Sequence, residues 1–243
     1  MIRIGITADW DEAAGKKRQV LNAEYTDWVY GAGMLPVVLP AIPGSEDEAL
    51  AGLSAIILSG GGDIRPELYG SDPEPLPTEK FSHPERSAFE FALVWRSLRL
   101  SMPVLGICLG CQTINAAMGG DLVRHLEDPR ARHRRPSVEH PATRHRLHVA
   151  PNSLMESLYP SPDTRVVSSH HQALGRIAPG WVVTSWGPAS IPESIESAQY
   201  PRALGVQWHP ERTPRSLFSE NLAAWLKEQG EEYASRMNSD GER

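Results

Sequence analysis

The sequence is poor in cysteine, in long apolar runs and in positive charge, and each shortage excludes a class of protein. The two cysteines, Cys108 and Cys111, lie three residues apart, so the chain has no disulfide framework. No apolar stretch approaches the roughly 20 residues that span a bilayer, and the first residues predict a strand, not the apolar core of a signal peptide. The net charge of −6 argues against a dedicated nucleic-acid binder. We therefore expect a cytoplasmic protein that binds neither membranes nor nucleic acid.

Residues 124–148 depart from this average, because seven arginines and five histidines gather there. Such a run is typical of a solvated loop, but it could also grip carboxylates, whose geometry the forked guanidinium matches. Nucleic-acid binding is the weaker interpretation, since no aromatic residues are interleaved.

Short β-rich apolar runs alternate with helical patterns in the first half of the chain, which predicts a parallel sheet with crossover helices. The predicted strands are 2–7, 35–40, 54–59 and 103–107, and the predicted helices are 18–33, 45–53, 83–100 and 109–120. The second half is richer in predicted strands, at 145–150, 164–169, 181–186, 194–200 and 203–208, and ends in a helix over 215–234. The length suits a single domain over residues 1–236, followed by a frayed polar tail at 237–243.

A cysteine framed by glycines is the strongest local signal in the chain. Gly106 and Gly110 stand two residues before and after Cys108, where a predicted strand passes into a predicted helix. This spacing mirrors the G-x-S-x-G corner, in which a nucleophile sits on a tight strand-to-helix turn. The corner places the sulfur at the carboxyl edge of the sheet, where ligands bind, and at a helix N-terminus, which favours the thiolate. The pattern predicts a cysteine nucleophile.

Three other interpretations of the cysteines remain open at this point. A C-x-x-C redox pair would account for Cys111, but it leaves both glycines unexplained. A zinc site needs three or four ligands, so histidines would have to complete it. Burial in a strand–helix packing layer is the ordinary fate of a lone cysteine, and we expect it for Cys111.

A histidine base and a group that orients it are needed to activate a cysteine nucleophile. The stretch "LGVQWHPE" ends a predicted strand with His209, and Glu211 follows two residues later. His209 could accept the thiol proton and pass it to a leaving amine, while Glu211 holds the other ring nitrogen. A His-Pro-Glu at a strand end is otherwise an ordinary polar turn, so this interpretation depends on the glycine-framed cysteine.

An oxyanion hole requires two hydrogen-bond donors near the sulfur. One is expected from the backbone N–H of Leu109, directly after the nucleophile. The other is expected from the glycine run at 60–62, which we assign to Gly61, because glycines let the main chain approach a ligand closely. A phosphate cradle is the alternative interpretation of this run, but the Lys-Ser/Thr of a P-loop is missing.

These motifs together resemble the class I glutamine amidotransferase superfamily. Within it, "GGGDIRPELYG" and "SSHHQAL" are most similar to the γ-glutamyl-γ-aminobutyrate hydrolases, and the likeness runs from the first strand to about Pro214. The resemblance implies a flavodoxin-like three-layer α/β/α fold, with a mostly parallel central sheet and extra antiparallel strands in the C-terminal half. It also implies a γ-glutamyl thioester on Cys108, with His209 and Glu211 completing a triad. The expected substrate-binding residues are Gly60, Gly62, Asp63, Gln112, Ser169, His170, His171 and Gln172.

The chain departs from the hydrolases at three places. The hydrolases usually carry an Arg directly after the nucleophile, where this chain has Leu109. Their long helix opens with an Arg-Asp pair, which is Arg86-Ser87 in this chain. Their Asn before Ser-x-His-x-Gln is replaced by Val167. These changes bear on the substrate, not on the thiol chemistry. The adjacent histidines, His170 and His171, could also be plain loop residues, and a shared metal is not expected because neighbouring side chains on a strand point to opposite faces.

Three functions remain possible from the sequence. The first is a stand-alone hydrolase of γ-glutamyl amines that needs no metal or organic cofactor. The second is a glutaminase subunit that passes ammonia to a partner synthase by the same chemistry. The third is an inactive binding module. If the leaving amine is cationic, the acidic loop at 63–79 would suit it; if the amine carries a carboxylate, the arginine-rich segment would suit it. A homodimer is expected only because homodimers are common among soluble oligomers.

Overall fold

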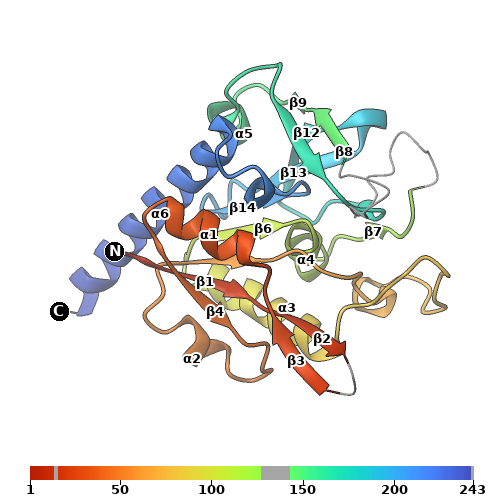
Figure 1. Ribbon diagram of the computed structural model, residues 1–243, viewed down its shortest axis with the longest axis horizontal. Helices are drawn as coiled ribbons and strands as arrows, with labels where there is room; N and C mark the ends of the chain where they lie inside the picture. The colour runs from red at the N-terminus through yellow and green to blue at the C-terminus, as the bar shows by residue number, and fades with distance from the viewer. Residues whose placement is uncertain (14–15, 127–142, 242–243) are drawn as a thin grey trace.

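A mixed sheet forms the centre of the protein in the computed structural model, which describes residues 1–13, 16–126 and 143–241 (Figure 1). Across the described part the sheet has eight strands in the order β4 (Leu35–Leu39), β1 (Arg3–Thr7), β5 (Ala55–Leu58), β6 (Val104–Ile107), β14 (Ala203–Val206), β13 (Pro192–Glu196), β12 (Val182–Trp186) and β9 (His148–Val149). The pairs from β4 to β14 are parallel, and those from β14 to β9 are antiparallel. Numbered among themselves, the parallel strands follow the flavodoxin order 2-1-3-4-5. The predicted flavodoxin-like fold is confirmed.

Helices cover both faces of the sheet, which is why its inner strands are apolar throughout. Ile56 of β5 packs into one core with α2 (Glu46–Leu50), α3 (Pro84–Arg99) and α4 (Leu109–Ala117). The next residue, Ile57, packs on the other face with α1 (Ala23–Gly31), α5 (Leu154–Leu158) and α6 (Leu217–Gly241). Successive side chains on a strand point to opposite faces, so a continuous apolar run supplies both cores.

The predicted helix over 18–33 is wrong at its start. β2 (Asp9–Ala13) and β3 (Lys16–Val20) form an antiparallel hairpin, and α1 begins only at Ala23. The residues of β3 are largely exposed, and Arg18 pairs with Asp11 across the hairpin at 2.7 Å. Cross-strand pairing therefore overrides the helical spacing that the sequence shows here.

One predicted strand of the second half divides differently from the expectation. Residues 145–150 split between β8 (Thr143–Arg146) and β9, and β8 pairs with β10 (Arg165–Ser168) in a separate ribbon. β7 (Leu122–Val123) and β11 (Ala173–Leu174) form another. Short 3-10 helices complete the described elements: η1 (Pro66–Tyr69), η2 (Pro188–Ser190) and η3 (Pro210–Arg212).

The C-terminal helix is longer than the sequence analysis predicts. α6 continues to Gly241, so residues 237–241 are helical and not the expected frayed tail. Residues 235–239, Ser-Arg-Met-Asn-Ser, contain neither Gly nor Pro, and an exposed helix can continue through such residues. Among the described helices, none is both long and apolar enough to cross a bilayer.

Candidate active site

Cys108 stands on a strained corner between β6 and α4. Its backbone has φ 54° and ψ −104°, which a non-glycine residue rarely adopts. The corner is fixed from both sides, because the Cys108 N–H donates to Val206 O at 2.8 Å and the Cys108 carbonyl accepts from Gln112 N at 3.2 Å. The structure thus confirms the predicted turn.

The flanking glycines are required by close backbone packing. A Cβ on Gly106 would lie 2.5 Å from Gly110 O, and a Cβ on Gly110 would lie 2.2 Å from Leu58 O. Neither distance is tolerated, so any side chain at these positions would push α4 away from the sheet. This is the physical reason for the glycine spacing around Cys108.

A buried His–Glu pair lies beside the corner. β14 and β6 are parallel neighbours, so residues that follow the two strands lie at the same edge of the sheet. His209 Nδ1 is 2.6 Å from Glu211 Oε1, and the two residues are 4% and 2% exposed. A Cβ on Gly60 would lie 3.0 Å from His209 Cε1 and 3.6 Å from Cys108 Cβ, so the imidazole and the cysteine border one glycine. The structure therefore brings the predicted residues together.

The environment of His209 favours its protonated form. Burial lowers the pKa of the imidazole, but the charges of Glu211 and Cys108, with hydrogen bonds to both, outweigh burial and raise the pKa to about 9. An imidazolium at neutral pH can donate a proton, which is what a departing amine requires.

The glycine loop after β5 is clamped by residues that the sequence analysis missed. Arg86 Nη2 donates to Ser59 O at 2.9 Å and Gly60 O at 3.2 Å, and the Gly60 N–H donates to Tyr25 Oη at 2.8 Å. A Cβ on Gly61 would lie 2.3 Å from Arg86 Nη1, so the fork packs directly under the loop. The sequence analysis named Arg86 only as part of a pair in which the chain differs from the hydrolases, and nothing in the sequence points to Tyr25. Gly61 and Leu109 remain predicted oxyanion donors.

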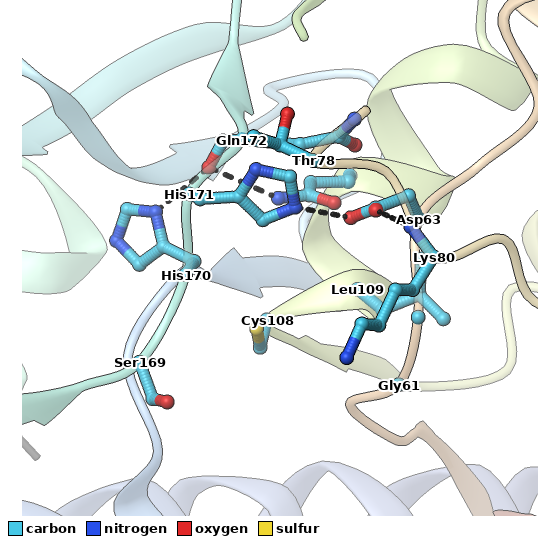
Figure 2. A pocket seen from close by; sticks show the side chains of 12 residues that line it. Gly61, Asp63, Thr78, Lys80, Cys108, Leu109, Ser169, His170, His171 and Gln172 are labelled. Atoms are coloured by element: carbon cyan, nitrogen blue, oxygen red, sulfur yellow. Dashed lines mark hydrogen bonds and ion pairs between the residues drawn. The ribbon is translucent and has the colours of Figure 1, made fainter. Parts of the chain in front are cut away.

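A small cavity of about 150 Å³ opens beside the sulfur (Figure 2). Its lining residues are Gly61, Gly62, Asp63, Thr78, Lys80, Cys108, Leu109, Gln112, Ser169, His170, His171 and Gln172. All predicted substrate-binding residues except Gly60 are among them, while Thr78 and Lys80 were not predicted. Asp63 and Lys80 give the cavity groups of both signs.

The two adjacent histidines have different partners (Figure 2). His171 Nε2 is 2.9 Å from Asp63 Oδ1, whereas His170 Nδ1 donates to Gln172 O at 2.7 Å and its Nε2 lies 3.5 Å from Glu193 Oε1. Burial is the main cause that lowers the pKa of His170 to about 3, so this ring is neutral at physiological pH. Among the described residues, no three His, Cys, Asp or Glu side chains are grouped so that they could hold a metal ion.

The acidic loop and the arginine-rich segment meet beside Gln172, which lines this cavity. Arg124 binds Glu79 at 2.6 Å, and Glu79 in turn accepts from Gln172 Nε2 at 3.3 Å. The hydrogen bond to Arg124 is the main cause that lowers the pKa of Glu79. Arg124 is thus tied to the acidic loop, while residues 127–142 of the segment lie outside the described residues.

A second cavity of about 490 Å³ reaches Cys108 from the side of α1 and the β2–β3 hairpin. Its lining includes His209, Gly60, Gly61 and Ser169 beside Cys108, and also Asp9, Asn22, Glu24, Tyr25 and Arg212. The sequence analysis did not predict this cavity, because its walls come from segments far apart in the chain. The sulfur therefore borders two cavities with different linings.

The fold is shared with glutamine amidotransferases of known structure. A glutamine amidotransferase from Thermotoga maritima matches with a TM-score of 0.64 at 16% identity, over 95% of this chain and 98% of the other. A second, from Methylobacillus flagellatus, matches with a TM-score of 0.56 at 18% identity, over 86% of this chain and 70% of the other. At 16% and 18% identity, these likenesses show the fold alone.

Sequence comparison identifies the family to which the chain belongs. The model of the peptidase C26 family matches residues 3–211, and the chain belongs to that family. A γ-glutamyl-γ-aminobutyrate hydrolase of Escherichia coli K12 is 31% identical over 86% of this chain and 85% of its own length. A Mycobacterium tuberculosis protein, whose name assigns it provisionally to the glutamine amidotransferases, is 35% identical over 98% of this chain and 74% of its own length. The family and its named hydrolases support a hydrolase.

Proposed function

We propose that the protein hydrolyses the γ-glutamyl amide bond of γ-glutamyl amines, releasing glutamate and a free amine. The Cys108 thiolate attacks the γ-carbonyl, and His209, held by Glu211, protonates the departing nitrogen. Water then attacks the thioester, with His209 accepting its proton, and the thiolate is regenerated. Leu109 and Gly61 supply the backbone donors for the oxyanion. These steps require no metal and no organic cofactor.

The observation that carries this proposal is the pair of cavities meeting at the sulfur. The small cavity suits the glutamyl end, since an α-ammonium and an α-carboxylate need groups of both signs, such as Asp63 and Lys80. The larger cavity is lined by His209, the proposed proton donor, and by residues of α1 and the β2–β3 hairpin that do not line the small cavity. It therefore provides space for an amine larger than ammonia, which a glutaminase would not need.

A glutaminase subunit remains the second candidate, because a relative's name assigns it to the amidotransferases. The two functions separate in one experiment on the isolated chain with a panel of γ-glutamyl amides that includes glutamine. Cleavage of larger γ-glutamyl amines without any partner supports the hydrolase. If only glutamine is turned over, or nothing is cleaved, the proposed function is wrong.

Narrowing the larger cavity is expected to discriminate between substrates by size. Asn22 lies on its wall, so Asn22→Trp should raise KM for bulky γ-glutamyl amines at least several-fold and leave glutamine turnover nearly unchanged. Asp27→Trp, at an exposed position of α1 that is not among the cavity's lining residues, is the matched control. Equal effects of the two variants on all substrates would show that the amine does not occupy this cavity.

The pH dependence of turnover should report His209. Because its pKa is raised to about 9, kcat/KM is expected to fall as the pH rises through this value and the imidazolium is lost. Glu211→Gln removes the carboxylate that stabilises the imidazolium, so the alkaline limb should move to lower pH. Glu232→Gln, which alters only an exposed pair with Arg202, should leave the limb in place. An unchanged limb in Glu211→Gln would contradict the assigned role.

A further inference from the structure

Gln207 is a buried amide that contacts the nucleophile, and neither the sequence analysis nor the proposed mechanism uses it. It follows β14 directly and is fully buried. Its Nε2 lies 3.7 Å from Cys108 Sγ, a hydrogen-bonding distance for sulfur, and its Oε1 lies 3.2 Å from Gln112 Nε2. Its backbone N–H donates to Glu193 O at 2.8 Å, which fixes the residue from behind.

The hydrogen-bond partners determine which way this amide faces. Gln112 Nε2 lies 3.3 Å from the carbonyl oxygen of Gln172, which can only accept, so this end of Gln112 is the donor. A donor from Gln112 requires the oxygen of Gln207 to face it. The Gln207 NH₂ group is then the end that faces the sulfur. The nitrogen and oxygen of an amide are similar in size and shape, so it is these hydrogen-bond partners that assign the orientation of Gln207.

Two consequences follow from this orientation. A donor aimed at the sulfur stabilises its anionic form more than its neutral form, because hydrogen bonds to charged groups are the stronger ones. Both N–H groups of Gln112 are directed to Gln172 and Gln207, so the group left to meet a ligand in the small cavity is its acceptor oxygen. An acceptor there suits the α-ammonium of a glutamyl group.

We propose that Gln207 is a catalytic residue that donates a hydrogen bond to the sulfur of Cys108 and, through Gln112, couples the small cavity to the nucleophile. The inference rests on the proposed function insofar as Cys108 is the nucleophile. The donor is in place before substrate binds, so it acts on the reactivity of the free thiol as well as on turnover.

Alkylation of Cys108 by iodoacetamide tests this role without any substrate. Gln207→Met keeps an unbranched side chain of similar size but removes the donor. At pH 7 the alkylation rate, followed by peptide mass mapping, should fall roughly tenfold, and the midpoint of the rate–pH curve should move to higher pH. The maximal rate at high pH should be retained, which a merely packing role would not predict. Gln199→Met, at an exposed glutamine that lines neither cavity at the sulfur, should match the wild type.

Steady-state kinetics of the same variants provide the second measurement. Gln207→Met should lower kcat for γ-glutamyl amides about tenfold and change KM less than twofold, because Gln112 still faces the cavity. If Gln207→Met does not fold, the same measurements on Gln207→Asn test the proposal. Asn keeps the amide, but its side chain is one methylene too short to contact both Cys108 and Gln112. Alkylation curves that coincide with the wild type overturn the proposal. If the alkylation effect appears while the whole amide panel is refractory, the role of Gln207 stands and the proposed function fails.

Discussion

Cys108→Ala is expected to abolish γ-glutamyl amide cleavage, with a loss of roughly 10⁴-fold or more in kcat. The proposed mechanism passes through a thioester on this sulfur, and no other thiol can replace it. Cys111 is fully buried within the strand–helix core, and burial raises its pKa well above the ordinary value, which makes it a poor nucleophile. The measurement is steady-state turnover of the best substrate of the amide panel, with folding checked by circular dichroism.

Cys111 provides the matched control for this prediction. Cys111→Ala should keep most of the activity and lose stability, because its sulfur is packed against the core around Ile114 and Gly205. An electrophilic glutamine analogue should form a mass adduct on Cys108 in the wild type and in Cys111→Ala. Adduct formation on Cys111, or substantial activity in Cys108→Ala, would refute the assignment of the nucleophile.

Arg86→Leu is expected to cost about 3–5 kcal/mol of the free energy of unfolding. Arg86 is fully buried between Asp9, at 2.8 Å, and Glu90, at 2.9 Å. Without it, Glu90 retains the hydroxyl of Thr7, at 2.6 Å, but loses its buried counter-ion. The loop at 59–60 loses its clamp at the same time, so activity should fall even in molecules that remain folded. Urea unfolding at pH 7.5 measures the stability change.

The pH dependence of this stability loss provides a second check. Burial raises the pKa of Glu90 and Arg86 lowers it, so removing Arg86 should raise that pKa further. A raised folded-state pKa contributes stability below the unfolded value and loses it as the pH rises through the folded value. The Arg86→Leu protein should therefore be less destabilised at pH 5 than at pH 7.5. A pH-independent loss would contradict the role of Glu90.

Another arginine of α3 separates the effect of burial from the effect of charge. Arg96 pairs with Asp47 at the surface, where both side chains are more than one-third exposed. Arg96→Leu should cost less than about 1 kcal/mol, because water already solvates that pair. If Arg86→Leu and Arg96→Leu lower the free energy of unfolding by similar amounts, burial of the Arg86–Glu90 pair does not account for the loss.

The sequence by itself determined the features that consecutive residues create. Gly106, Cys108 and Gly110 belong to one corner, so their spacing predicted it, and the spacing of His209 and Glu211 predicted a pair that the structure confirms. The alternation of apolar runs predicted the parallel half of the sheet for the same reason, since a strand buried on both faces must be continuously apolar. Each of these inferences depends on the local backbone, whose geometry the neighbouring residues set.

Only the tertiary structure decided the features that join distant segments. The β2–β3 hairpin replaced the start of a predicted helix because pairing between strands outweighs local spacing. Arg86 reaches a loop 27 residues away, and Gln207 reaches a sulfur 99 residues away. The larger cavity likewise exists only where α1, the hairpin and the end of β14 meet. Such contacts leave no periodic mark in the sequence, because the geometry that creates them belongs to the folded chain as a whole.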